Sequence, residues 1–210
     1  PEGKAIHALT LKDGGAIRVT MIDAAVPSVF VSAYEVAGDT RSRPGAIDEN
    51  AGLMARLEDI RRQASVAMGL TPDPEAAAQR IATPKVAMVG PAADYEDLSG
   101  IIHPASAQDL QIRMISAGQA HRAVPVTGAL ALACAAVVDG SVVADCISQG
   151  ADPLNLRIGT PSGIVTVGAT CDPRSGEIEA ARILRTQRRL MDGHIYLPMP
   201  SAVQPLAQPV

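Results

Sequence analysis

HRAVPVTGALALACA, residues 121–135, is the stretch that decides the fold. From Gly128 to Val138 the sequence has no polar face, which predicts a helix enclosed by other elements. Thr127 is expected to cap the start of this helix, and Asp139 with Gly140 is expected to end it. Cys134 falls inside the apolar run, where a cysteine normally serves as a small core hydrophobe.

Short β-like segments precede and follow this helix. In chain order they are Ala5–Leu11, Ala16–Ile22, Ser28–Ser32, Val86–Val89, Leu110–Ser116, Asn155–Gly159, Ile164–Ala169, Glu177–Arg185 and His194–Leu197. The first two flank Asp13-Gly14-Gly15, which is a hairpin signal. We therefore predict an α+β fold in which a curled, mostly antiparallel sheet surrounds one central buried helix. Residues 1–193 are expected to form one domain, and residues 194–210 a closing strand and a Pro-rich tail.

A second helix is predicted from Asp48, as its cap, to Met68. Leu53, Leu57, Ile60, Ala64 and Met68 fall on one face of it, and Gly69 ends it. A short helix over Glu75–Ile81 is expected after Pro72 and Pro74.

The composition excludes several classes of protein. The chain has 210 residues and a net charge of −4, and it is 47% hydrophobic but only 2% aromatic. Its core must therefore consist of Ala, Val, Leu, Ile and Met, and neither the charge nor the aromatic content suits nucleic-acid binding. The longest apolar run, Ala129–Val138, is too short for a bilayer, which takes about 20 residues. Three cysteines, Cys134, Cys146 and Cys171, with no signal peptide predict a reduced, cytoplasmic protein without nucleic-acid or membrane partners.

Neither metal nor nucleotide motifs occur in the sequence. The histidines are scattered at His7, His103, His121 and His194, and no Cys or His pair has the spacing of metal ligands. The sequence also lacks a glycine-rich phosphate loop. The arginines Arg182, Arg185, Arg188 and Arg189 could bind a carboxylate, but a solvated strand end explains their spacing better.

Two places could hold an anion. The first turn of the buried helix has N–H groups without partners, and Thr127, Gly128 and the helix dipole suit a negative charge. The corner Thr160-Pro161-Ser162-Gly163, within IGTPSGIVTVGA at residues 158–169, could supply further donors. An ordinary capped helix and a plain turn are the competing explanations. Together the two places suit a ligand with two or more carboxylates.

Four motifs resemble those of the PrpF-type isomerases, which include 2-methylaconitate isomerase and 4-oxalomesaconate tautomerase. They are IDAA at 22–25 with Pro27, RMISAGQAH at 113–121 with VTGA at 126–129, PSG at 161–163, and RTQRRLMDG at 185–193. They occur in family order. The resemblance implies the diaminopimelate-epimerase-like fold of two similar domains with the active site between them. This chain is similar to the second half, so a first-half domain, upstream or as a separate chain, is the expected partner and would carry the family's catalytic Cys and Lys.

The resemblance implies a cofactor-independent isomerase of an unsaturated di- or tricarboxylate, such as an aconitate or an oxalomesaconate. The implied substrate-binding residues are Ser116, Ala117, Gly118, Thr127, Gly128, Thr160, Ser162 and Gly163, with no catalytic residue in this chain. Pro125 replaces the acid–base Cys of racemases with this fold, which argues against a two-thiol racemase. Val26, where the family often has Asn, and Thr160, where His is common, leave the exact substrate open.

Cys134, Cys146, His121 and Lys85 are the internal candidates for acid–base chemistry, and none has an evident activating neighbour in sequence. We therefore expect the chain by itself to lack isomerase activity. An exposed cleft face would be covered by the partner or by a second copy of the chain. The alternative function is a non-catalytic half that binds small anions or pairs with another subunit.

Overall fold

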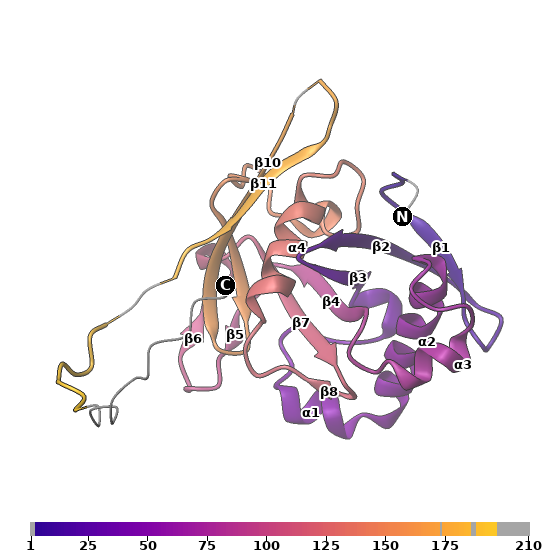
Figure 1. The fold of residues 1–210 in the computed structure, drawn as a ribbon, viewed down its shortest axis with the longest axis horizontal. Helices are drawn as coiled ribbons and strands as arrows, with labels where there is room; N and C mark the ends of the chain where they lie inside the picture. The colour runs from indigo at the N-terminus through magenta and orange to yellow at the C-terminus, as the bar shows by residue number, and fades with distance from the viewer. Residues whose placement is uncertain (1–2, 173, 186–187, 197–210) are drawn as a thin grey trace, which may run out of the picture.

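A nine-stranded sheet forms the framework of the molecule (Figure 1). The computed structural model describes residues 3–172, 174–185 and 188–196. The strands of the sheet are β1 (His7–Thr10), β2 (Ala16–Ala24), β3 (Val26–Ser32), β4 (Lys85–Pro91), β7 (Leu110–Ser116), β8 (Gln119–Ala120), β9 (Leu156–Thr160), β10 (Gly163–Cys171) and β11 (Ile178–Ile183). Their order is β1-β2-β3-β4-β7-β9-β10-β11, and β8 also pairs with β7.

Most neighbouring strands run antiparallel, as predicted. The exceptions in the described part of the chain are the parallel pairs β3–β4 and β7–β9. A two-stranded ribbon, β5 (Tyr95–Glu96) with β6 (Ile102–His103), stands outside the sheet and was not predicted. The predicted hairpin of the first two strands is confirmed, with Leu9 opposite Ile17.

The two faces of the sheet carry separate hydrophobic cores, because successive residues of a strand point to opposite faces. On β3, Val29 and Val31 belong to the core under helix α2 (Ala51–Ala67), whereas Phe30 belongs to the core under helix α4 (Val126–Ala136). The same alternation on β4 places Val86 on the α2 face and Ala87 on the α4 face. Each face is therefore identified by the helix that covers it.

Helix α4 is the predicted apolar helix, and it is buried along most of its length, including Leu132 and Cys134. It contacts β2 and β3, and also β10 and β11 near the other end of the strand order. The predicted cap is wrong. Pro125 precedes the helix, and the Thr127 side chain makes no capping hydrogen bond because Thr127 is already the second helical residue.

The other predicted helices are confirmed with different boundaries. Asn50, rather than Asp48, caps α2, with its side chain accepting from the N–H of Leu53. Asp48 lies in a separate short helix, α1 (Pro44–Glu49), and accepts a hydrogen bond of 2.7 Å from the N–H of Ala120. Helix α3 (Pro74–Gln79) is capped by Asp73 and ends before Ile81.

The C-terminal predictions are tested only in part. The predicted strand Glu177–Arg185 is β11, which forms a long hairpin with β10 (Figure 1). The predicted strand at His194–Leu197 is wrong over its described part, because residues 194–196 have no strand partner, and Leu197 lies outside the described residues. Residues 186–187 of the closing motif and the rest of the tail also lie outside them. In the described part of the chain, no helix is long and apolar enough to cross a membrane.

Candidate functional site

The corner between β9 and β10 is shaped by the hydroxyl of Thr160. This buried side chain donates a hydrogen bond of 2.8 Å to the carbonyl of Gly163 and accepts one of 3.2 Å from the N–H of Ser162. Gly163 has φ of 102°, a left-handed conformation that favours glycine. The hydroxyl of Thr160 is therefore engaged in the turn, whereas Ser162 is exposed at its tip.

Ser162 connects the corner to the segment that leads into α4. Its hydroxyl donates a hydrogen bond to the carbonyl of Arg122, which lies 40 residues earlier in the chain. One of the two places that the sequence suggested for anion binding is therefore tied to the segment that leads into the other. This contact is the main structural evidence that they form one site.

The start of α4 offers free backbone donors. The N–H groups of Val126, Thr127 and Gly128 have no hydrogen-bond partner among the described residues, and Val126 and Thr127 are exposed. Gly128 serves packing: a β-carbon there would lie 2.5 Å from Sδ of Met114 on β7. The glycine thus lets α4 begin directly on the sheet, and its buried side faces Met114 rather than a ligand.

Ser116 lies on the same face of β7 as Met114, because the two are separated by one residue. It is therefore about 7 Å further along the strand than Met114. In the β4–β7 register, Val86 pairs with Ile115, which places Lys85 beside Ser116. The ammonium of Lys85 donates a hydrogen bond of 3.0 Å to the Ser116 hydroxyl.

His121 joins this group from the opposite side of β7. Its backbone N–H donates to the carbonyl of Met114 at 2.8 Å, which continues the β7–β8 pairing. The side chains of His121 and Met114 therefore both lie on the α4 face. Its Nε2 atom is buried and has no partner among the described residues. Burial lowers the pKa of His121, and the charge of Lys85 lowers that pKa further. Burial also lowers the pKa of Lys85.

Ala117 and Gly118 form the turn between β7 and β8 and have φ of 52° and 78°. They border a hollow of about 320 Å³ on the α2 face, which Ser116, Glu58 and Arg61 also line. The predicted site residues are thus divided. By strand alternation Ser116 lies on the face of the α4 start, although it also borders the hollow toward α2 together with Ala117 and Gly118. Ser162 lies against the segment leading into α4.

A polar support behind the corner was missed by the sequence analysis. Asp97 is 4% exposed and accepts a hydrogen bond of 2.8 Å from Nε2 of His103. That bond, followed by N–H donors from Ser99 and others, holds the pKa of Asp97 below its usual range. The next residue, Leu98, donates its N–H to the carbonyl of Pro161 at 2.8 Å. The ribbon therefore fixes the corner from outside.

Arg113 and Tyr95 extend this support. The guanidinium of Arg113 lies over the Tyr95 ring at 5.4 Å, and Tyr95 stacks on His103. Arg113 is 1% exposed and donates to the carbonyls of Ser42 and Ile112, and burial lowers its pKa to about 10. The one sequence signal that could have revealed the role of Arg113 is its position within the alternating pattern of β7, because a charged side chain is not expected to be buried there.

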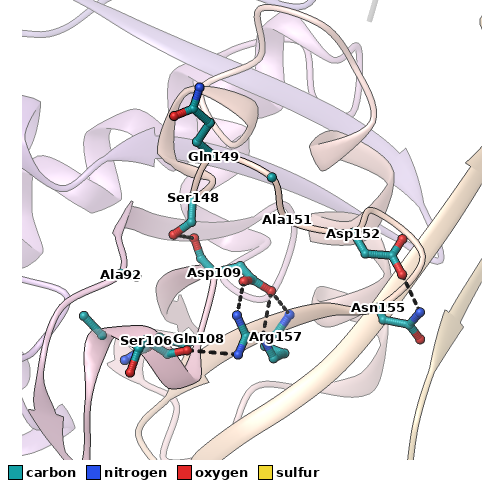
Figure 2. Close-up of a pocket in the computed structure, with 12 residues that line it drawn as sticks. Ala92, Ser106, Gln108, Asp109, Ser148, Gln149, Ala151, Asp152, Asn155 and Arg157 are labelled. Carbon is teal, nitrogen blue, oxygen red and sulfur yellow. Dashed lines mark hydrogen bonds and ion pairs between the residues drawn. The ribbon is translucent and has the colours of Figure 1, made fainter.

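The hollow in Figure 2, of about 480 Å³, is a poor anion site despite its polar lining. Arg157 is its only described cation, and Asp109 accepts hydrogen bonds from both its Nε and its Nη2. The remaining nitrogen of Arg157 donates to the carbonyl of Ser106 at 3.0 Å. The charge of Arg157 is therefore already compensated.

The two thiols that the sequence suggested for acid–base chemistry are poorly placed for it. Burial raises the pKa of the Cys134 thiol, and burial together with Asp145 raises the pKa of Cys146 to about 11. Both therefore remain protonated at neutral pH. Within the described ranges, no cluster of three His, Cys, Asp or Glu side chains could hold a metal ion.

Known proteins resemble this chain along nearly its whole length. A 2-methyl-aconitate isomerase of Shewanella oneidensis is 32% identical over 95% of this chain and 51% of the relative. A 3-methylitaconate isomerase of Eubacterium barkeri is 31% identical over 94% of this chain and 52% of the relative. The chain thus spans about half the length of these curated relatives.

The fold agrees with these matches. The crystal structure of a methylitaconate-delta-isomerase superposes with a TM-score of 0.82 and 31% identity, covering 92% of this chain and 50% of that one. The family described as PrpF protein matches residues 1–198. By sequence along almost its entire length and by fold, the chain belongs to the PrpF family.

Proposed function

We propose that this chain supplies one half of the cleft of a cofactor-independent isomerase that acts on an unsaturated di- or tricarboxylate. The observation that carries the proposal is the contact between Ser162 and the carbonyl of Arg122. It holds the exposed corner against the segment that leads into α4, and the free N–H groups at the start of that helix favour an anion. The names of the relatives, which are isomerases of 2-methyl-aconitate and 3-methylitaconate, support this substrate class.

The proposed reaction is an allylic proton shift or a cis–trans isomerisation. A general base removes a proton from carbon, the negative charge spreads over the double bond and the neighbouring carboxylate, and a proton returns at another carbon. The N–H groups of Val126, Thr127 and Gly128 hold a carboxylate and stabilise the charge that develops on it. The carboxylate delocalises that charge, so the step requires no cofactor.

The proton-transfer groups belong to the other half of the proposed enzyme. Cys134 and Cys146 hold their protons too tightly at neutral pH, and Pro125 cannot exchange a proton. The chain alone is therefore expected to bind substrate without converting it.

The fold that we infer is the second domain of a diaminopimelate-epimerase-like protein, with the sheet curled around α4. Contacts of α4 with β2 and β3, and with β10 and β11, support the curling, because these strands lie toward opposite ends of the sheet order. Residues 1–193 would form this domain, and residues 194–210 would dock on the first-half domain. The relatives are about twice as long as the chain, which supports a partner of similar size.

Binding tests the site directly. Isothermal titration of the 210-residue chain with trans-aconitate and citrate should show binding. Ser162→Ala should weaken it by up to about tenfold, because it removes the hydrogen bond that holds the corner against the segment leading into α4. Ser175→Ala, in the exposed loop between β10 and β11, is the matched control and should change nothing. Equal affinity in the two variants would refute the role of the corner.

Activity separates the enzyme from the alternative of a non-catalytic anion-binding half. The part of the Shewanella relative that this chain does not match can be produced as a separate polypeptide and mixed with it. Double-bond migration in 2-methyl-aconitate, followed by proton NMR, should appear only in the mixture. Binding without turnover in any such mixture, including one with a fused linker, would favour the non-catalytic alternative.

A further inference from the structure

We propose that Lys85 binds a second carboxylate of the substrate, with Ser116 as the residue that positions its ammonium group. The inference rests on the proposed function and extends it, because it assigns a charged residue to a site otherwise made of backbone and hydroxyl donors. Such a residue would decide how many carboxylates the substrate must carry.

The strand registers place Lys85 on the α4 face of the sheet. Ala87, two residues further along β4, belongs to the core under α4, so Lys85 points to the same side. Its neighbours across the sheet are Ser28 on β3 and Ser116 on β7. Met114 lies against Gly128 at the start of α4, and Ser116 lies about 7 Å from Met114 along the same face of β7. The ammonium, which is bonded to Ser116, is therefore on the strand segment next to the one that meets the helix start.

Lys85 has a positioned ammonium group but no counter-charge. Its hydrogen bond to Ser116 is 3.0 Å long, and the Ser116 hydroxyl in turn donates a hydrogen bond of 3.4 Å to the carbonyl of Ala82. No carboxylate in the described part of the chain forms an ion pair with Lys85. Partial burial of an unpaired ammonium is unfavourable, and burial accordingly lowers its pKa. A substrate carboxylate would relieve this cost.

His121 is the other titratable group on this face. Its lowered pKa keeps it neutral at pH 7 and above, so it does not compete for the anion there as a second cation. With the helix start holding one carboxylate and Lys85 another, the arrangement favours di- and tricarboxylates over monocarboxylates.

The test compares two lysine substitutions by isothermal titration of the full chain with trans-aconitate at pH 7.5. Lys85→Met should weaken binding about tenfold to a hundredfold, as loss of a charged hydrogen bond does. Lys12→Met, in the exposed turn between β1 and β2, removes the same charge elsewhere and should not change the affinity. Lys85→Arg keeps the positive charge and should retain most of the wild-type affinity. This variant separates a charge effect from a folding defect.

The pH dependence supplies the readout that a structural role of Lys85 would not affect. Since the ammonium form binds the anion, the affinity of the wild type should fall as the pH rises through the pKa of Lys85, and that of Lys85→Met should not. Ser116→Ala should change the pH at which the affinity falls. NMR titration of the Lys85 Nζ or Cε signal should show the same change in the pKa of Lys85. Equal affinity of wild type and Lys85→Met would overturn the inference and leave the proposed function intact. Absence of carboxylate binding to the wild type would instead refute the proposed site as a whole.

Discussion

Replacing Gly128 by Ala tests whether α4 begins directly on the sheet. A β-carbon at this position would lie 2.5 Å from Sδ and 2.6 Å from Cε of Met114, closer than van der Waals contact allows. Met114 is 2% exposed, so its thioether can move only by displacing core neighbours. Such overpacking costs about 1–3 kcal/mol, and the gain in helix propensity is at most about 1 kcal/mol. We therefore expect the free energy of unfolding to fall by about 1–2 kcal/mol.

Gly45→Ala is the matched control. Gly45 also lies in the first turn of a helix, α1, but a β-carbon there would meet no atom within 4 Å. Its free energy of unfolding should stay unchanged or rise by up to about 1 kcal/mol. Urea unfolding followed by circular dichroism measures both variants, and each kcal/mol should correspond to about 2–4 °C in the midpoint of thermal unfolding.

A double-mutant cycle identifies the contact responsible. Met114→Ala removes the atoms that the new β-carbon would meet, so Gly128→Ala should cost at least about 0.5 kcal/mol less in that background than in the wild type. If Gly128→Ala is as stable as Gly45→Ala, or if the cycle shows no coupling, the packing of α4 on Met114 is wrong. The placement of Ser116 and Lys85 near the helix start would then lose its basis.

Two further predictions concern other parts of the fold. Gly168→Ala should lower the free energy of unfolding by about 3 kcal/mol or more, because a β-carbon there would meet backbone atoms of Leu154, its carbonyl oxygen at 2.2 Å; a thermal midpoint near that of the wild type would contradict this. Asp97 has a lowered pKa because of its hydrogen bond from His103, so its contribution to stability is present above the ordinary aspartate pKa of about 4 and is lost as the pH falls through the folded-state value. Asp97→Asn should therefore be less stable than the wild type at pH 7, and this difference in the free energy of unfolding should narrow toward pH 3 in urea titrations. A difference that stays constant would rule out the charge of the Asp97 carboxylate as its cause.

Local sequence patterns predicted most of the longer elements of the fold, but they missed the β5–β6 ribbon and some element boundaries. The apolar run from Gly128 identifies α4 because no amphipathic alternative exists for it. The capping residues failed for a physical reason: Asp48 and Thr127 both have cap-forming side chains, yet Asp48 bonds a distant N–H at Ala120, and Pro125 already sets the backbone that precedes α4. Such competition between local and long-range partners leaves no trace in the sequence.

The sequence indicated individual residues of the candidate site but not which of them contact one another. The corner at Ser162 and the helix start at Gly128 were each recognisable, whereas their contact depends on a bond to the carbonyl of Arg122. Lys85 was identified as a candidate for acid–base chemistry and not as part of the substrate-binding site. Its relation to Ser116 follows from the register of two strands about thirty residues apart in the chain, which only tertiary structure determines.

The chemistry of these groups argues for a division of labour between the two halves of the proposed enzyme. Backbone N–H groups at a helix start can stabilise negative charge but cannot accept a proton. Lys85 has a lowered pKa when its ammonium is unpaired, which could make it a base, but a bound carboxylate would raise that pKa again. Occupation of the site therefore makes Lys85 a better cation and a poorer base. His121 is neutral at pH 7, but its Nε2 atom is buried. In the proposed enzyme we therefore expect the proton that leaves the substrate to go to a group on the opposite wall of the cleft, toward which this half would orient the carboxylates.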